Sequence, residues 1–588
     1  MDKQNVGNLY ENQMNVNQTQ SNPTYEDQPY QNHVCANQAY VNQYFQLEQP
    51  VKKEESALRI RMKEQFSFFV LISALYAVFY AFCLYQNVWG ITYPFFTIGT
   101  LCYFFCSMKK LEVPYKKGSL FYLISVVLLG VSNCITTSYE LISLNKLAAF
   151  LLFFILILHT VYNDTGWDFS YYLVAIFRTI GSAIAAVLSP LTDMSSFFAA
   201  KKQENDNKTG TIIYVAIGIS IAIPILVLII ALLCSADIVF NSAVKSLISF
   251  DLRTICSICL LMFIVFFASY AMICALCKKS VPEEVSDKKI FEPIIGIVFT
   301  SLLALVYLCF SMIQILYLFI GRMQLPEGYT YSAYARQGFF QLLFVCILNL
   351  ILVLTCLKLF RENMILKGIL TVISFCTFIM ILSSALRMFM YIATYNLTFL
   401  RLFVLCALMV IFLLMAGVTA YIYIRRFPLF FYSAAVTTVI YIAFSFAHPD
   451  YWIARYNLNP IYNNYQDEYD VMSNFNYLAY LSSDAASVIL NEEYNPYLEK
   501  FVEIKENREE LYGLTNTKED GYDNGLDLYG EENGDTYEEY HNTKNIRYDN
   551  DTEWIYRYHH RICISADEMK IRSFNFSLCL ANRRARSL

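Results

Sequence analysis

Charged residues and helix breakers are scarce in this sequence of 588 residues. Only 16% of the residues are charged, and the chain holds 14 Pro and 20 Gly. Soluble globular chains carry about 25% charged and about 45–50% apolar residues, whereas 56% are apolar here. The apolar residues gather in long runs, which excludes a soluble enzyme, a collagen-like chain and a wholly disordered one. The 17 Cys lie mostly inside those runs and exclude a disulfide-rich secreted domain.

Motifs that carry well-known chemistry are also missing. The sequence has no phosphate-binding Gly-x-x-x-x-Gly-Lys-Ser/Thr, no His-Glu-x-x-His and no Gly-x-Ser-x-Gly. ATP-driven transport by this chain alone is therefore excluded, and no catalytic residue is assigned. Two Cys-x-x-Cys pairs, 256–259 and 274–277, share one apolar run, and a helix would separate them by about 27 Å. We therefore expect no metal site and no cofactor.

What the sequence has instead is a series of apolar runs long enough to span a bilayer, which takes about 20 residues. Eleven runs qualify: 66–86, 88–107, 119–137, 145–162, 211–234, 254–277, 294–320, 338–358, 368–386, 401–424 and 428–446. The stretch 169–190 is also apolar but carries Arg178 at its middle. The pattern predicts an all-α polytopic helical membrane protein with about 11 transmembrane helices and one interfacial helix.

Lys and Arg in the connections predict the orientation. With a cytoplasmic N-terminus, and with 169–190 not crossing, the cytoplasmic loops hold 21 Lys and Arg and the outer loops hold 7. A crossing at 169–190 would invert that pattern. We therefore expect an interfacial or partly buried helix there, a cytoplasmic N-terminus and an extracytoplasmic C-terminus.

The parts outside the spans differ strongly in composition. Residues 1–60 form an Asn/Gln/Tyr-rich arm, expected to be disordered and cytoplasmic, and residues 61–446 form the transmembrane domain. Residues 447–588 hold 26 acidic and 14 basic residues. We divide this tail into a motif-bearing segment, 447–490, an acidic flexible insert, 491–556, and a C-terminal segment, 557–588, that docks back. The charge distribution argues against a nucleic-acid partner.

Six short polar-aromatic strings fall in the predicted outer regions: Ser235–Phe240, Tyr329–Phe339, Arg387–Arg401, His448–Asn457, Leu481–Ala485 and Arg572–Ser577. Together they resemble the bacterial membrane proteins grouped as domains of unknown function 4153 and 4173, more closely the latter. The resemblance implies a fold and a bacterial plasma-membrane location but no reaction. The chain departs from that pattern at Asn396, where the family more usually has Gly. Asn also tolerates a left-handed backbone, so we expect a turn there.

The predicted topology places all six strings on one side of the membrane. Charges near hydrocarbon need partners, so we expect an outward-facing polar cluster in which Asp237 and Asp450 pair with arginines. The candidate residues are Asp237, Tyr334, Arg336, Arg387, Tyr391, Tyr395, Arg401, Asp450 and Arg455. This cluster is either a binding site for an anionic or polar envelope ligand or a clamp that holds the tail on the membrane domain.

Three functions stay open. A sensing or regulatory envelope protein, with an outer site and a cytoplasmic protein partner, fits best because the six strings share one face. A secondary transporter or flippase would need mid-membrane polar residues, and few are present. An envelope-modifying enzyme would need a catalytic constellation, and none is visible. The lipid bilayer is the expected partner in every case. Cys563 and Cys579 lie in the predicted outer tail, and a disulfide between them stays open.

Overall fold

The computed structural model describes residues 55–87, 89–204, 252–283, 289–316, 338–424, 426–459, 468–515 and 550–588, and single positions between 226 and 237. By internal contacts the chain divides into Met1–Glu55 and Ser56–Leu588. All the helices described below belong to the second unit. The predicted disordered arm falls mostly outside the described residues, and its last four positions, 57–60, belong instead to a helix.

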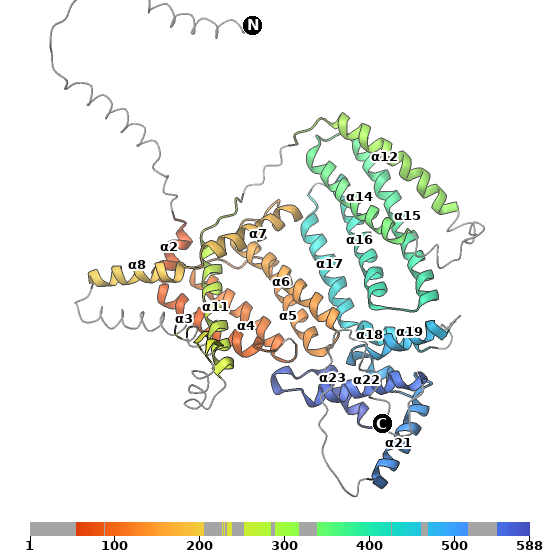
Figure 1. Cartoon of the computed structure of the whole chain (residues 1–588). Helices are drawn as coiled ribbons and strands as arrows, with labels where there is room; N and C mark the ends of the chain where they lie inside the picture. The colour runs from red at the N-terminus through yellow and green to blue at the C-terminus, as the bar shows by residue number, and fades with distance from the viewer. Residues whose placement is uncertain are drawn as a thin grey trace, which may run out of the picture. The chain divides into compact units, whose positions relative to one another are not determined.

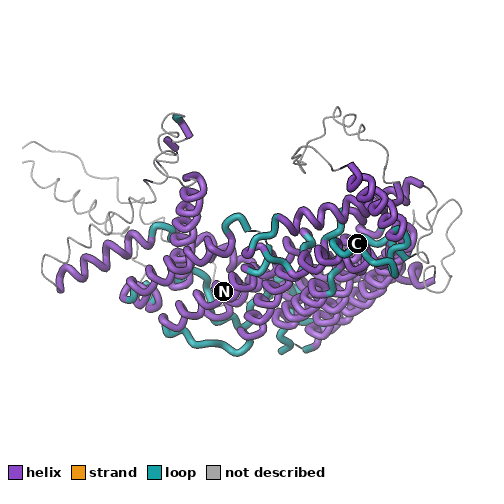
Figure 2. The backbone as a smooth tube through the Cα atoms, turned by 90° about the horizontal axis from the view of Figure 1, so that it is seen from below, coloured by secondary structure: helices purple, strands orange, loops and turns teal. Residues whose placement is uncertain are grey.

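The described residues are mostly helical, with loops between the helices, and form no strand (Figure 2). The helices of the apolar part are α2 (Ala57–Glu64), α3 (Phe66–Leu84), α4 (Thr92–Lys110), α5 (Ser119–Ile135), α6 (Tyr139–Val161), α7 (Phe169–Ala185), α8 (Ser189–Glu204), α11 (Leu252–Cys277), α12 (Pro293–Gln314), α14 (Phe339–Leu359), α15 (Met364–Tyr395), α16 (Phe399–Tyr423) and α17 (Leu429–Phe446). The tail forms α18 (Pro449–Asn457), α19 (Glu468–Ala479), η5 (Ser483–Ala485), α20 (Ala486–Ile489), α21 (Leu498–Thr515), α22 (Asn550–Asp567), η7 (Ile571–Ser573) and α23 (Phe576–Ala585).

Residues with special backbone or capping properties begin several of these helices. Asp168 starts α7 by accepting a hydrogen bond from the Tyr171 amide at 2.8 Å, and side chains of this type commonly cap helix N-termini. Gly118 before α5 and Gly338 before α14 have φ angles of +100° and +86°. Only glycine adopts that backbone without steric cost, so each apolar run begins its helix at a defined residue.

The helices of the apolar part form two groups by their contacts (Figure 1). In the first helix group, α3 to α6 pack in chain order, with α11 against α3 and α7 against α6 and α11. In the second, α15 contacts α12, α14 and α16, and α17 packs on α16. Polar side chains join α17 to the first group. Ser445 hydrogen-bonds Ser132 at 2.6 Å, and Asn145 accepts hydrogen bonds from Ser445 and Tyr441 at 2.9 and 2.8 Å. Interhelical bonds of this kind hold membrane helices together.

The predicted fold class is confirmed: the chain is a polytopic helical membrane protein. Eight described helices are long and apolar enough to cross a membrane: α3, α6, α11, α12, α14, α15, α16 and α17. Two other predicted spans form helices that do not meet this criterion, because α5 has only 17 residues and α4 includes Thr, Tyr and Lys residues. The predicted span 211–234 lies outside the described residues apart from a few single positions.

Contacts between loops sort the helix ends into two sets, which define two faces. We name the first the basic face, because lysines and arginines pair there with acids from other loops. Arg61 contacts Glu112 at 2.8 Å, Arg361 contacts Glu292 at 2.6 Å, and Lys358 pairs with Asp168. The second set comprises the loops 85–91, 136–138 and 396–398 and the junction 447–448, all of which touch the tail. We name it the tail face.

Residues 169–190 form α7 and the start of α8, two helices bent by 55° relative to each other. Asp168, just before α7, pairs with Lys358 on the basic face. Within α8, Asp193 pairs with Arg59 of α2 at 2.5 Å, and the Tyr270 hydroxyl also donates to Asp193, at 2.8 Å. The start of α7 and the second turn of α8 thus both lie next to the basic face, and by length and composition the bent pair is either one broken span or a re-entrant loop.

The tail packs into a core of its own that continues into the second helix group. Residues buried in this core include Phe475, Leu498, Phe501, Trp554 and Ile555. Two parts of the predicted flexible insert, 491–556, are therefore helical instead, namely α21 and the first turns of α22. Leu498 and Phe501 of α21 and Trp554 and Ile555 of α22 are buried in this core, and that burial outweighs the acidic composition. Residues 516–549 lie outside the description. Cys563 and Cys579 are both free thiols.

Candidate functional site

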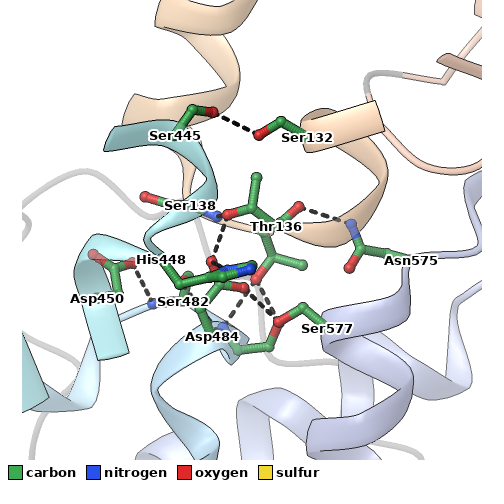
Figure 3. Close-up of polar contacts among 12 residues, drawn as sticks. Ser132, Thr136, Ser138, Ser445, His448, Asp450, Ser482, Asp484, Asn575 and Ser577 are labelled. Carbon is green, nitrogen blue, oxygen red and sulfur yellow. Dashed lines mark hydrogen bonds and ion pairs between the residues drawn. The ribbon is translucent and has the colours of Figure 1, made fainter. Parts of the chain in front are cut away.

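Polar residues from four separate segments meet where the tail docks on the tail face (Figure 3). Each segment supplies them at a helix end, where backbone groups lack helical partners. Thr136 follows α5, His448 separates α17 from α18, Ser482 caps η5, and Asn575 caps α23. We name this set the junction cluster; its members are Thr136, Thr137, His448, Asp450, Ser482, Ser483, Asp484, Asn575 and Ser577.

Asp484 is the centre of the junction cluster, and its side chain is fully buried, at 0% exposure. One carboxylate oxygen accepts a hydrogen bond from the Thr136 hydroxyl at 2.6 Å and lies 3.0 Å from Nδ1 of His448. The other accepts a short hydrogen bond from the Ser577 hydroxyl. A buried carboxylate is costly unless donors surround it. Three donors from three different segments do so here, and the carboxylate therefore ties those segments together.

His448 is held in an unusual position at the junction of α17 and α18. Its φ angle is +49°, in the left-handed region, which costs free energy for any residue with a Cβ. Its side chain remains 34% exposed. The hydrogen bond to Asp484 and the charges of Asp484 and Asp450 raise the pKa of the imidazole, whereas burial alone would lower it. The protonated imidazole is thus the form that this site favours.

Asp450 lies in the first turn of α18 and is only 5% exposed. It accepts a hydrogen bond from the Ser482 amide at 3.2 Å. Burial, reinforced by the charge of Asp484, raises its pKa to about 6 despite that hydrogen bond. The expected pairing of Asp450 with an arginine is wrong within the described residues. Arg561, the cation that interacts with Asp450 through its charge, instead donates to the carbonyls of Ala479 and Leu481.

Hydroxyl and amide groups complete the junction cluster. Thr137 and Ser483 are joined twice, by their hydroxyls at 2.6 Å and by the Ser483 amide at 2.9 Å. Asn575 donates to the Thr136 carbonyl at 2.7 Å, and the Ser577 hydroxyl lies 2.9 Å from that of Ser483. The loop after α5 is therefore bonded to both η5 and α23.

A second set of contacts fixes the tail to the loop between α3 and α4. The Asn87 amide donates to the Arg572 carbonyl at 3.2 Å, and the Ile91 amide donates to the Phe574 carbonyl at 2.8 Å. Gly90 has a φ angle of +100°, and a Cβ built there would lie 2.7 Å from the backbone of Ser573. Glycine is thus required both for the turn and for the close approach of the two chains.

Three of the residues predicted as a site do lie together. The guanidinium of Arg401 lies 4.3 Å from the centroid of the Tyr391 ring and donates to the carbonyls of Tyr395 and Asn396. The rings of Tyr391 and Tyr395 are 5.0 Å apart. Asn396 ends α15 with a φ angle of +67° and a ψ angle of 172°, so its backbone has the positive φ expected there but not the ψ of a left-handed turn. Arg401 therefore caps the end of α15, where carbonyl groups lack helical partners.

The other predicted residues are held in separate contacts. Arg387 is buried in α15 beside Gln314, with 3.4 Å between the hydrogen-bonding atoms. Arg455 contacts the Tyr451 hydroxyl at 2.8 Å and lies over the Tyr494 ring. Asp237 is exposed. Tyr334 and Arg336 lie outside the described residues. The nine candidates are thus not gathered in a single cluster among the described residues.

Of the junction cluster, the predicted site contains only Asp450, although His448, Asp484 and Asn575 lie within the six strings. Three of these strings, His448–Asn457, Leu481–Ala485 and Arg572–Ser577, have a polar residue at a helix end. No pattern in the sequence pairs Thr136 with Asp484, because 348 positions separate them.

The order of groups in the junction cluster limits its chemistry. In a Ser-His-Asp triad the imidazole lies between the hydroxyl and the carboxylate and activates the hydroxyl. Here the carboxylate of Asp484 lies between the imidazole of His448 and the hydroxyls of Thr136 and Ser577. The arrangement can take up and release protons, but His448 is not placed to activate either hydroxyl.

The fold and the site define the class: a polytopic helical membrane protein with a helical tail docked on one face through buried polar groups. The chain belongs to the family described as domain of unknown function DUF4153, whose model matches residues 123–492. The match includes Thr136, His448, Asp450 and Asp484 but ends before α21. The closer resemblance to family 4173 is not confirmed. No curated protein and no solved structure matches the chain.

Proposed function

We propose that this chain is a sensing or regulatory membrane protein of the bacterial envelope, in which docking of the tail on the tail face responds to protons outside the cell. The observation that carries the proposal is the contact of His448 with the buried carboxylate of Asp484, 3.0 Å from Nδ1. It lies where the end of α17, η5, α23 and the loop after α5 are bonded together. A change in its charge would therefore act on all four segments.

The charge balance around His448 sets the direction of the response. Asp484 of η5 and Asp450 of α18 raise the pKa of His448. The pKa of Asp450 is in turn raised by burial and by the charges of Asp484 and Glu140. Arg561 and Tyr558 of α22 face the same carboxylates.

Because both pKa values are raised, both groups favour the protonated form in the docked state. For His448, the stabilisation is present at low pH and is lost as the pH rises through its docked pKa. For Asp450, docking becomes less favourable as the pH rises from the ordinary carboxyl range to about 6. Acid thus strengthens docking, and a rise in pH weakens it.

The orientation of the chain is part of the proposal. Among the described residues, loops predicted to be cytoplasmic meet on the basic face, and the positive-inside rule assigns such loops to the cytoplasm. The tail face then lies outside. An outer sensor needs an output, and the basic face together with the Asn/Gln-rich arm is the surface we assign to a cytoplasmic protein partner.

Hydrogen exchange in lipid nanodiscs tests the proposal. We expect the protection of amides in residues 570–588 to fall between pH 5 and pH 8, after correction for the intrinsic pH dependence of exchange. In H448Q the part of this fall above about pH 6, which His448 causes, should be largely absent, whereas the part that Asp450 causes below about pH 6 should remain. The matched control is H560Q, because His560 stacks on Tyr556 outside the junction cluster and its replacement should leave the pH profile unchanged.

The same experiment separates a sensor from a clamp. A sensor should transmit the change, so that amides of α2 and of the loop 162–168 on the basic face also alter their exchange with pH in the wild type and not in H448Q. A pH response confined to the tail face would refute the sensing function. An unchanged pH profile in H448Q would refute the role of His448.

A further inference from the structure

A cavity of about 510 Å³ lies within the first helix group, lined by residues of α3, α4, α5, α6 and α11. This volume falls within the range of about 300–1,000 Å³ that is usual for small-molecule sites. The polar residues of its wall include Tyr80 near the end of α3, Asn87 just after it, Tyr93 at the start of α4 and Lys146 in the second turn of α6. These positions all lie at the end of the helices next to the tail face.

Away from the tail face the wall is mainly apolar, although Tyr76, Thr97 and Thr100 also line it, with the Tyr76 and Thr100 hydroxyls 2.9 Å apart. Phe150 and Phe154 follow Lys146 on α6, one and two turns further along, and also line the cavity. At 1.5 Å per residue, Phe154 lies about 12 Å along the helix axis from Lys146. Val126 of α5 and Met272 of α11 complete this part. The cavity thus has a polar end and an aromatic, apolar end.

The polar groups at that end lack partners. The ammonium of Lys146 lies 5.8 Å from the centroid of the Tyr93 ring, and it makes no ion pair or hydrogen bond with the described residues. Tyr93 is only 7% exposed, and its hydroxyl has no hydrogen-bond partner in the described chain. Asn87 Oδ1 is buried without a partner as well. A cation in apolar surroundings is costly unless an anion compensates it.

We propose that this cavity binds a lipid with a phosphate headgroup. The Lys146 ammonium and the Tyr93 and Tyr80 hydroxyls offer several donors to the phosphate oxygens, and one apolar chain lies along Phe150 and Phe154. A phospholipid of the surrounding leaflet and a polyprenyl phosphate share this chemistry. The side-chain amide of Asn87 also donates to the carbonyl of Arg572 in the docked tail. A lipid bound beside Asn87 would therefore affect docking of the tail, a link that rests on the proposed function.

Direct binding measurements test the site without reference to sensing. The purified protein is placed in phosphatidylcholine nanodiscs and titrated with phosphatidylglycerol in one arm and with a polyprenyl phosphate in the other, and the bound lipid is counted by native mass spectrometry. The matched control for K146Q is K110Q. Lys110 also lies over an aromatic ring, that of Phe68 at 5.5 Å, but it is at the basic-face end of α4 and does not line the cavity.

We expect at least one lipid arm to show saturable binding that is unchanged in K110Q and at least tenfold weaker in K146Q. The arm with the tighter binding identifies the source of the phosphate. Equal weakening in the two variants would mean attraction to net charge alone and would overturn the proposal, as would equal affinity of K146Q and the wild type.

A second variant keeps the test decisive if K146Q does not fold. Y93F removes one hydroxyl and leaves the ring in place, and we expect it to weaken binding about threefold to tenfold, the usual effect of losing one hydrogen bond. Unchanged affinity in Y93F would overturn the proposed headgroup contact. Because binding is measured without reference to pH or exchange, failure here leaves the proton-sensing proposal to be judged by its own experiment.

Discussion

Replacing Asp450 with Asn should stabilise the docked tail at neutral pH. The carboxyl of Asp450 is 5% exposed, and burial raises its pKa to about 6, compared with about 3.9 for an ordinary aspartate. Ionisation of this carboxyl therefore costs more free energy in the docked state than in water. Asn is uncharged and of similar shape, and its Oδ1 can still accept the hydrogen bond from the Ser482 amide, 3.2 Å away in the wild type.

The size of the effect follows from the difference in pKa. A difference of one in pKa corresponds to about 1.4 kcal/mol between protonation states, so a difference of about two makes the ionised carboxylate cost about 3 kcal/mol. Below about pH 3 the carboxyl is protonated in both states and the cost vanishes. The stability gained by D450N should therefore be about 0.5 kcal/mol at pH 4 and rise to about 3 kcal/mol at pH 7.

Opening free energies from hydrogen exchange measure this difference. Amides of α19, α20 and α22, which pack around Asp450, should show the gain in D450N relative to the wild type. The control is D551N. Asp551 lies at the surface of α22, 4.0 Å from Lys500, and 53% of its side chain is exposed, so its replacement should change stability by less than about 0.5 kcal/mol. A D450N protein less stable than the wild type at pH 7, or a gain that does not depend on pH, would refute the reasoning.

Two further predictions concern the two faces. On the basic face, R59A leaves the buried carboxylate of Asp193 without the Arg59 guanidinium, its partner at 2.5 Å. We expect a loss of about 3–5 kcal/mol in unfolding free energy, measured by denaturation in detergent. A loss below about 1 kcal/mol would contradict the burial of this pair. On the tail face, G90A forces a Cβ against the backbone of Ser573 and a side chain onto a left-handed turn, which should cost about 1–3 kcal/mol and release residues 570–580 to faster exchange. Wild-type protection in G90A would show that this contact does not hold the tail.

The grouping of loops on the two faces is the part of the fold that the distribution of Lys and Arg predicts best. The sequence predicts which loops share a side from Lys and Arg alone, and the structure brings together those loops that it describes, as Arg61 with Glu112 and Lys358 with Asp168. The same count predicts that 169–190 does not cross, and Asp168 before α7 and Asp193 in the second turn of α8 both pair with cations of the basic face. Loop charge is a property of composition, so it needs no knowledge of packing.

The candidate site was harder to predict because it depends on partners distant in the chain. The predicted site consists largely of arginines and tyrosines at helix ends, and one group of them, around Arg401, does lie together. Asp450, however, is satisfied by the backbone amide of Ser482. Every residue except proline carries a backbone N–H group. The sequence therefore cannot show which of these groups will pair with a carboxylate. The flexible insert was misjudged for a related reason, since Leu498 and Trp554 meet only when α21 and α22 pack together.

The sequence by itself determined that this chain crosses a membrane many times, because runs of apolar residues lower their free energy in hydrocarbon wherever the helices pack. It also determined the family and the separation of basic loops from an acidic tail. Only the tertiary structure decided which polar groups meet. Asp484 is buried and hydrogen-bonded because Thr136, His448 and Ser577, from three distant segments, converge on it. Their convergence depends on how the helices pack, which no local pattern in the chain records.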